Sequence, residues 1–226
     1  MNSSRDYYYE EIGENFDQWM SDYDVRRRTL LIQKHLGQRG AGKSCLEVGS
    51  GTGKISRVII RSVGALTVSD ISEKLAGAVG TKLNCAAMRQ DACALSVADN
   101  SFEVVVSSEC IEHSPDPSKA LREMARVLKP GGLLIVTTPN KMWYPILWLS
   151  MALGVRKFSG REVWMFPWHA ASVLRDAGMS EIKLDGCHLF PWQIPLAKKV
   201  LPLFDRIGKL LYPVMINFCV TAVKKP

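Results

Sequence analysis

The sequence predicts an α/β fold, with a doubly wound and mostly parallel sheet, on two observations. From Ser44 to Asn140, apolar runs of strand length alternate with amphipathic segments of helix length, which is the pattern of βαβ units. Polar residues or glycines follow four of these runs, as they do at the ligand-binding edge of such sheets. The 226 residues contain no internal repeat and no low-complexity linker, so we expect a single domain, 1–226.

Each expected strand is a short apolar run bounded by turn residues. In chain order the strands are expected at Ser44–Val48, Ala65–Val68, Ala86–Arg89, Phe102–Ser107, Gly132–Thr138, Glu181–Gly186 and Ile216–Lys224. The clearest helix is Pro117–Leu128, because it begins at proline, repeats apolar residues at helical spacing and ends at a Lys-Pro-Gly-Gly run. A later helix is expected over His169–Ala177, where Gly178 ends it.

Three segments lie outside this alternation and are expected to cover the ligand-binding edge of the core, 44–140. Residues 141–166 and 188–215 are rich in Trp, Leu and Pro, and we interpret them as helical cap insertions. Residues 1–43 are expected to form N-terminal lid helices, because apolar side chains recur at helical spacing from Ile12 to Tyr23. Packing of these side chains in the core is an equally good interpretation.

Composition limits the environment of the protein. The longest nearly uncharged run, 142–155, is too short to cross a bilayer, and the N-terminus has no apolar signal region. A cytoplasmic protein is therefore expected. The six cysteines are widely spaced, with no histidine at metal-ligand spacing, so we expect buried free thiols and no metal site.

The net charge of +7 is concentrated in the last third of the chain. Residues 141–226 contain 12 Lys and Arg against 5 Asp and Glu, and they hold five of the six Trp. A basic, Trp-rich surface suits nucleic acid, an anionic membrane or an acidic substrate, and composition alone does not choose among them.

A glycine-rich loop is the first chemical motif. The run LEVGSGTG, residues 46–53, follows the first strand and precedes an apolar helix through Ile55 and Val58. Its glycines let the backbone turn sharply and approach a ligand, and the helix N-terminus offers free N–H groups. Lys54 stands where a dinucleotide fingerprint needs Gly or Ala, which argues against NAD.

A second glycine-rich run, GQRGAGKS at residues 37–44, satisfies the P-loop pattern. A P-loop follows a strand and opens a helix, whereas here the helical segment Thr29–Leu36 comes first and a strand follows. We therefore interpret this match as a coincidence and not as a nucleoside triphosphate site.

Acidic and polar residues follow the next three strands. Asp70 closes the second strand, where an acidic side chain can accept hydrogen bonds from a ribose diol. Asp91 and Ala92 follow the third strand, and Ser108 and Glu109 follow the fourth. Because the carboxyl ends of parallel strands meet at one edge, these residues and the glycine loop are expected to form one site.

With these motifs the chain resembles the class I S-adenosylmethionine-dependent methyltransferases, in the branch of the ubiquinone and menaquinone biosynthesis enzymes. The resemblance is strong over residues 44–140. It rests on LEVGSGTG (46–53), SDIS (69–72), QDA (90–92), ADNSFEVV (98–105), EH (112–113) and RVLKPGG (126–132). It implies a Rossmann-like sheet of seven strands, the last antiparallel, and S-adenosylmethionine as cofactor. Glu103 departs from the Asp that the family more often has.

The resemblance also implies which residues hold the cofactor. The methionine part is expected among Glu47, Gly49, Gly51 and Gly53, with its amino group near the backbone of Ser108 and Glu109. The nucleoside is expected on Asp70 for the ribose, on Ile71 for the face of the adenine, and on Asp91 and Ala92 for the adenine amino edge.

Methyl transfer from a sulfonium mainly needs orientation, and a base is needed only where the acceptor must lose a proton. His113, just past the fourth strand, is the candidate catalytic base. An equally good interpretation is that Glu112 and His113 only order their loop. His169 and His188 are weaker candidates, and His35 is expected to be solvated.

The absence of one sequence motif limits the chemical class of the methyl acceptor. Methyltransferases of DNA bases and of protein glutamine carry Asn/Asp-Pro-Pro-aromatic after the fourth strand, where this chain has SSEC, residues 107–110. An oxygen or an activated carbon of a small molecule is therefore expected. We favour an amphiphilic or lipid-linked acceptor, with peripheral membrane contact through the basic Trp-rich segment, over a soluble aromatic one. Alternatives are a nucleic-acid methyltransferase or binder, although no nucleic acid is expected, and a non-catalytic cofactor-binding partner subunit.

Overall fold

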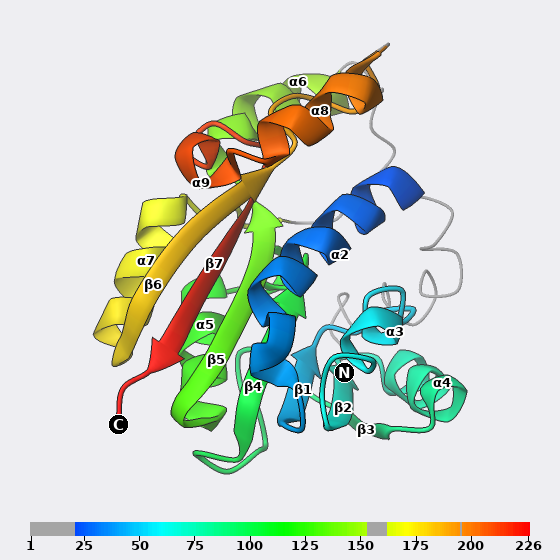
Figure 1. Cartoon of the computed structure of the whole chain (residues 1–226), viewed down its shortest axis with the longest axis vertical. Coiled ribbons are helices and arrows are strands. Elements are labelled where there is room, and N and C mark those ends of the chain that lie inside the picture. The colour runs from blue at the N-terminus through cyan, green and yellow to red at the C-terminus, as the bar shows by residue number, and fades with distance from the viewer. Residues whose placement is uncertain (1–20, 153–161, 195) are drawn as a thin grey trace.

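The computed structural model in Figure 1 describes residues 21–152, 162–194 and 196–226. A seven-stranded sheet has the order β3-β2-β1-β4-β5-β7-β6. Its strands are β1 (Ser44–Val48), β2 (Ala65–Asp70), β3 (Ala86–Arg89), β4 (Phe102–Ser108), β5 (Leu128–Pro139), β6 (Met179–Cys187) and β7 (Asn217–Lys224). The pairs among β1 to β5 are parallel, and β7 is antiparallel to both of its neighbours. The predicted fold class is thereby confirmed.

The strand boundaries differ from the prediction mainly at β5. This strand begins at Leu128, four residues before the predicted Gly132, because Leu128 already pairs with Phe102 across an irregularity in the ladder. Gly131, at φ +74°, lies within that irregularity, so the Lys-Pro-Gly-Gly run that ends the preceding helix is part of the strand.

Helices and short 3-10 turns connect the strands. The helices are α2 (Asp22–Leu36), α3 (Ser56–Ile59), α4 (Glu73–Leu83), α5 (Pro117–Val127), α6 (Tyr144–Ala152), α7 (Pro167–Asp176), α8 (Ala197–Asp205) and α9 (Gly208–Leu211). The turns are η2 (Gly37–Gly40), η3 (Ile111–His113) and η4 (Lys141–Trp143). The predicted Pro117 helix is α5, whose first turn is capped by the Asp116 carboxylate accepting from Lys119 N at 2.9 Å.

The central strands are buried on both faces, and alternate residues belong to different cores. Val105 and Leu134 pack with side chains of α5 and α7, whereas Val104 and Ile135 pack with side chains of α2, α3 and α4. In Figure 1, α2 crosses in front of the sheet and α5 lies behind it. Helices on both faces leave the strand ends as the place where a ligand can reach the backbone.

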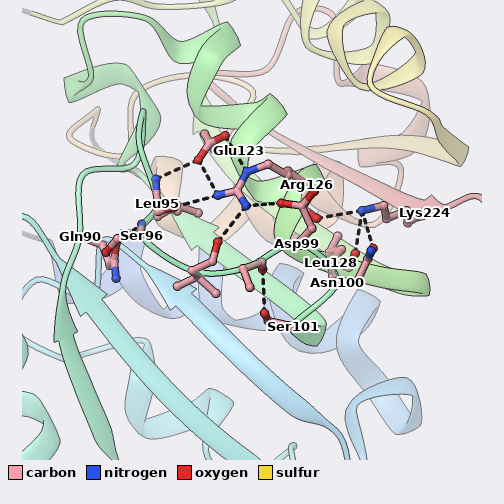
Figure 2. A network of polar contacts seen from close by, with 12 residues as sticks. Gln90, Leu95, Ser96, Asp99, Asn100, Ser101, Glu123, Arg126, Leu128 and Lys224 are labelled. Atoms are coloured by element: carbon pink, nitrogen blue, oxygen red, sulfur yellow. Dashed lines mark hydrogen bonds and ion pairs between the residues drawn. The ribbon is translucent and has the colours of Figure 1, made fainter.

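A polar network around Arg126 holds the loop between β3 and β4 (Figure 2). The guanidinium donates to backbone oxygens of that loop and to two carboxylates, with distances of 2.6 to 2.9 Å, at Leu95, Val97, Asp99 and Glu123. Lys224 of β7 donates from Nζ to Leu128 O and Asn100 Oδ1 at 2.8 and 3.0 Å. The start of this loop lies at the candidate site, so the network helps to position that part of the site.

The structure bears on one of two expectations for the N-terminal segment. Most of the predicted N-terminal apolar stripe, including Ile12, lies outside the described residues. The expectation that His35 is solvated is wrong, because its Nε2 lies 3.1 Å from Asp185 Oδ2 and only 11% of its side chain is exposed. This partner could not be predicted from the sequence, because α2 and β6 are far apart in the chain.

The P-loop-like run, residues 37–44, forms η2 and the entrance of β1, with α2 before it. This is the reverse of the strand-loop-helix order that a P-loop needs. The six cysteines are present as thiols; Cys45, Cys93, Cys187 and Cys219 are buried and the other two are partly exposed. Within the described ranges, no helix has both the length and the apolar character to cross a bilayer, and no three His, Cys, Asp or Glu side chains group as metal ligands.

Candidate functional site

A cavity of about 810 Å³ opens at the carboxyl ends of β1, β2 and β4. The glycine loop, the residues after these strands and one face of α2 line its polar part. Its other part is lined by apolar side chains of both predicted cap segments, among them Trp143, Ile146 and Leu147 of the first and Trp192 of the second. A single cavity therefore joins the two regions that the sequence analysis treated separately.

The glycine loop is held in place by the end of β2. Gly49 N and Ser50 N both donate to Ser69 O, at 2.8 and 2.9 Å. Gly49 has φ +79°, and a Cβ on it would overlap Cys110, so this glycine is required for packing. Gly51 has φ +51° and open space where a Cβ would stand, so its backbone is left accessible to a ligand.

Two details of the predicted loop differ. The predicted helix after the loop is only the single turn α3, so no long helix presents its N-terminus there, and the N–H groups of Gly49, Ser50, Gly51 and Gly53 already donate within the protein. Gly53 does not line the cavity; a Cβ on it would stand 3.0 Å from the Val79 side chain, which indicates a packing role.

Asp70 lies at the centre of the polar part. Its Oδ2 accepts from Gly51 N at 2.8 Å, its Oδ1 accepts from Ser72 N at 3.0 Å, and the residue is 8% exposed. Burial raises the pKa of this carboxyl although the backbone donors oppose the shift. Because each oxygen has a second lone pair, Asp70 can shape the glycine loop and still accept from a ribose hydroxyl.

The residues predicted for the adenine divide into two groups. Ile71 and Ala92 line the cavity, as does Gln90, which the sequence analysis did not assign. Asp91 does not line it, and its Oδ1 accepts from Cys93 N at 2.8 Å, which caps a local turn.

Buried polar atoms test whether the methionine part of the cofactor fits. Glu47 and Ser50 line the cavity, and Glu47 Oε2 and Ser50 Oγ have no hydrogen-bond partner among the described residues. Burial raises the pKa of Glu47 to about 8. A buried carboxyl oxygen without a donor is costly, and an ammonium group beside Glu47 would supply both charge and hydrogen bonds. The loop therefore fits an amino acid moiety such as that of S-adenosylmethionine.

This pKa shift predicts a pH dependence of stability. Without a ligand, the folded chain keeps a proton on Glu47 that the unfolded chain loses above about pH 4.5. The free energy of unfolding should therefore fall as the pH rises from about 5 to 8. Glu47→Gln should remove up to about 1.4 kcal/mol per pH unit of that fall, measured by urea unfolding at several pH values. Glu103→Gln, which alters a partly exposed carboxylate away from the cavity, is the control; equal slopes in Glu47→Gln and the wild type would contradict the assignment.

An ion-pair cluster from α2 enters the cavity and was missed by the sequence analysis. Arg28 donates from Nε and Nη2 to Asp24 Oδ2 at 3.0 and 2.7 Å, and from Nη1 to Ser108 Oγ at 3.2 Å. Asp24 and Arg28 line the cavity, so helix α2 contributes charged side chains to it. Their i,i+4 spacing on the buried face of a helix is the signal that could have found them.

His188 supports this cluster from the second cap segment. It is fully buried, and its Nε2 lies 3.0 Å from Asp24 Oδ1. His188 does not line the cavity, so it positions Asp24 and has no direct access to a ligand. His169 also lies outside the lining, with Nε2 3.3 Å from Ser118 Oγ.

Two further carboxyl groups, those of Glu109 and Glu112, line the cavity. Glu109 Oε2 accepts from Asn217 Nδ2 at 2.7 Å, and Glu112 Oε2 accepts from Thr138 Oγ1 at 2.9 Å. Burial raises the pKa of Glu109 to about 7 and that of Glu112 well above its usual range, to which the neighbouring Glu109 charge contributes. The predicted amino-group contact at Glu109 is limited to its carbonyl and side chain, because its N–H donates to Thr137 O at 2.9 Å.

His113, the predicted base, ends η3 and lines the cavity beside Glu112. Trp143 and Trp164 also line the cavity, and Trp164 donates from Nε1 to Glu162 Oε2 at 2.9 Å. A group that can accept a proton and a set of flat apolar walls therefore share one end of the cavity.

Comparison with known proteins agrees with this geometry. Residues 46–136 match the family model described as a methyltransferase domain. A probable S-adenosylmethionine-dependent methyltransferase of Mycobacterium tuberculosis is 28% identical over 180 residues, 76% of this chain and 60% of the relative. The ubiquinone/menaquinone biosynthesis C-methyltransferase of Hahella chejuensis is 34% identical over 167 residues, 66% of each chain. The chain thus spans about 60% of the length of the first of these relatives.

Solved structures share the fold over almost the whole chain. A Thermotoga maritima protein described as a possible histamine N-methyltransferase superposes with a TM-score of 0.70 at 19% identity, covering 97% of this chain and 99% of that one. At this identity the likeness is evidence for the fold alone. The matching domain model, the relatives and the cavity around the glycine loop place the chain in the class I S-adenosylmethionine-dependent methyltransferases.

Proposed function

We propose that the chain transfers the methyl group of S-adenosylmethionine to an oxygen or an activated carbon of a small amphiphilic or lipid-linked molecule. The observation that carries this proposal is the single cavity with two unlike ends. Its polar end meets the glycine loop, Asp70 and the unpartnered oxygen of Glu47. Its other end has apolar walls from both cap segments, together with Glu109, Glu112 and His113.

The residues of the polar end would bind and orient the cofactor. Asp70 would accept from the ribose while it holds Gly51 in place, and Glu47 with Ser50 would receive the amino group of the methionine part. When bound, the cofactor supplies an activated methyl group whose transfer leaves a neutral thioether. The chain then has mainly to align the acceptor, which can contribute roughly 7 to 11 kcal/mol to lowering the barrier.

The apolar end would hold the acceptor and exclude water. Trp143, Ile146 and Leu147 form walls that suit a hydrocarbon or ring system. An oxygen or carbon acceptor must lose a proton, and the imidazole of His113 at this end can take it. The relatives support both acceptor atoms, since they include a C-methyltransferase and, at 32% identity over 105 residues, the O-methyltransferase of ubiquinone biosynthesis in Coxiella burnetii.

Replacing the base separates catalysis from binding. His113→Ala should lower kcat by about 10²- to 10⁴-fold and leave the Kd for S-adenosylmethionine within a few-fold of the wild type. The wild-type rate should rise through the titration range of histidine, whereas the rate of the variant should not. Steady-state rates from pH 5.5 to 9 and calorimetric titration measure both quantities. An unchanged rate at all pH values would leave His113 with only a structural role in its loop.

The function itself is tested with S-adenosylmethionine labelled in its methyl group. The acceptor panel pairs hydroxylated ring compounds with and without a long alkyl or prenyl tail, and adds amines and RNA. Label on oxygen or carbon of a tailed acceptor, identified by mass spectrometry, is the expected result. Label confined to amines, RNA or tail-free compounds would overturn the proposed acceptor class. Cofactor binding without transfer to any member of the panel would favour a non-catalytic partner subunit.

A further inference from the structure

The exposed apolar side chains of the molecule gather at one end. Of the 14 large hydrophobic residues that are exposed in the described ranges, 12 lie in residues 142–149 and 194–214. They are Met142, Tyr144, Ile146, Trp148, Leu149, Ile194, Leu196, Val200, Leu203, Ile207, Leu210 and Val214. Figure 1 shows the helices of these segments, α6, α8 and α9, together above the tip of β5. We call residues 141–149 and 194–214 the cap surface.

The two halves of the cap surface are joined to each other. Trp143 Nε1 donates to Val214 O at 2.9 Å, and Asn140 Nδ2, directly before η4, donates to Pro213 O at 2.9 Å. These contacts join two segments whose nearest residues, Leu149 and Ile194, are 45 positions apart in the chain. Contiguous apolar exposure of this kind marks a surface that contacts another phase or another molecule.

Helix α6 cannot be explained as an ordinary surface helix. It contains no charged residue, yet Trp148 is 63% exposed and Ile146 and Leu149 are each 51% exposed. A helix without a polar face is normally buried in a core or in lipid. Leu210, on α9, is even more exposed, at 77%.

The exposed charge on the cap surface has one sign. Lys141, Lys198, Lys199, Arg206 and Lys209 are exposed. The acidic residue of these segments is Asp205, whose side chain is 7% exposed and pairs with Arg27 at 2.6 Å. A partner must therefore combine an apolar phase with negative charge.

We propose that the cap surface docks on an anionic lipid bilayer, with α6, α8 and α9 at the level of the headgroups. Trp and Tyr favour that interface, and lysine and arginine near it are attracted by anionic lipids. A second copy of the chain fits less well, because a twofold contact would bring lysine against lysine. Nucleic acid fits less well, because its interfaces are polar, whereas here apolar side chains outnumber cations.

The docking surface also borders the cavity. Ile146 is exposed on the cap surface and lines the cavity, and Trp192 and Gln193 of the lining directly precede Ile194. A lipid-linked acceptor could pass from the bilayer to the acceptor end without crossing water. This last step rests on the proposed function, whereas the docking itself does not.

Cosedimentation with vesicles tests docking without any methyl transfer. The purified chain is mixed with neutral phosphatidylcholine vesicles, or with vesicles containing 30% phosphatidylserine, at low and high salt. Binding to the anionic vesicles, weakened by salt, is expected. Lys198→Gln with Lys199→Gln should weaken it roughly 30-fold, and Leu203→Gln with Leu210→Gln at least about tenfold.

The controls change the same residue types elsewhere. Arg61→Gln with Lys82→Gln removes two exposed cations near the opposite end of the sheet, and Leu30→Gln removes an exposed leucine of α2. Both should leave vesicle binding unchanged, and thermal unfolding should show that every variant is folded. Binding to neither vesicle type, or equal losses in the control variants, would overturn the proposal, as would retention by RNA or dimer formation through the cap surface in place of vesicle binding. Lack of methyl transfer alone would leave it standing.

Discussion

Asp70→Asn is expected to weaken the binding of S-adenosylmethionine by about 100-fold. The carboxylate accepts from the backbone N–H groups of Gly51 and Ser72 and, in the proposed complex, also from the ribose. Asparagine keeps the shape but turns one oxygen into an N–H₂ group, which must face one of these donors. The glycine loop then loses its anchor at the same time as the ribose loses its acceptor. Calorimetric titration of wild type and variant measures the change.

Glu103→Gln is the matched control for this substitution. Glu103 also accepts from a backbone donor, Ser44 N at 3.0 Å, but at the amino end of β1, away from the cavity. It should alter stability slightly and leave the affinity unchanged. An affinity of Asp70→Asn equal to that of the wild type would remove Asp70 from the cofactor site.

Two glycines of the same loop should respond differently to alanine, the first mainly in stability and the second mainly in affinity for the cofactor. Gly49→Ala is expected to lower the free energy of unfolding by about 3 kcal/mol or more, because the new Cβ overlaps Cys110 at a φ of +79°. Gly51→Ala meets open space, so it should cost only about 1 to 2 kcal/mol for its left-handed backbone. The same methyl group projects toward the methionine part of the proposed complex, so affinity for the cofactor should fall at least about tenfold.

Urea unfolding and calorimetric titration distinguish the two effects. The double variant Gly49→Ala with Cys110→Gly removes the overlapping side chain and should recover most of the lost stability. If Gly51→Ala bound the cofactor as tightly as the wild type, the glycine loop would not be the place where the methionine part lies. If Cys110→Gly gave no recovery, the cost at Gly49 would come from the backbone alone.

Most elements of the core could be predicted from local sequence patterns. The strand runs from Ser44 to Thr138 and the helix at Pro117 were predictable because apolar periodicity and turn residues act over a few neighbouring residues. The glycine loop, Asp70, Ile71 and Ala92 were predictable for a related reason. In a parallel sheet the carboxyl ends of strands meet at one edge, so residues far apart in sequence inherit a common place from the fold class alone.

The same reasoning could not decide how single side chains are used. Asp91 and Gly53 stand at the predicted positions, but the first caps a turn and the second packs against Val79, outside the cavity lining. Their residue types suit either role, and only the direction of a side chain or of a missing Cβ tells the two roles apart.

The sequence by itself determined the fold class, the edge of the sheet that holds the site and the family to which the chain belongs. Only the tertiary structure placed Asp24 and Arg28 in the cavity, gave His35 a buried partner on β6, and left the apolar side chains of α6, α8 and α9 exposed. These outcomes depend on which distant segments pack against one another. Periodicity shows that a helix has an apolar or charged face, but the partner of that face is set by contacts between residues more than 100 positions apart.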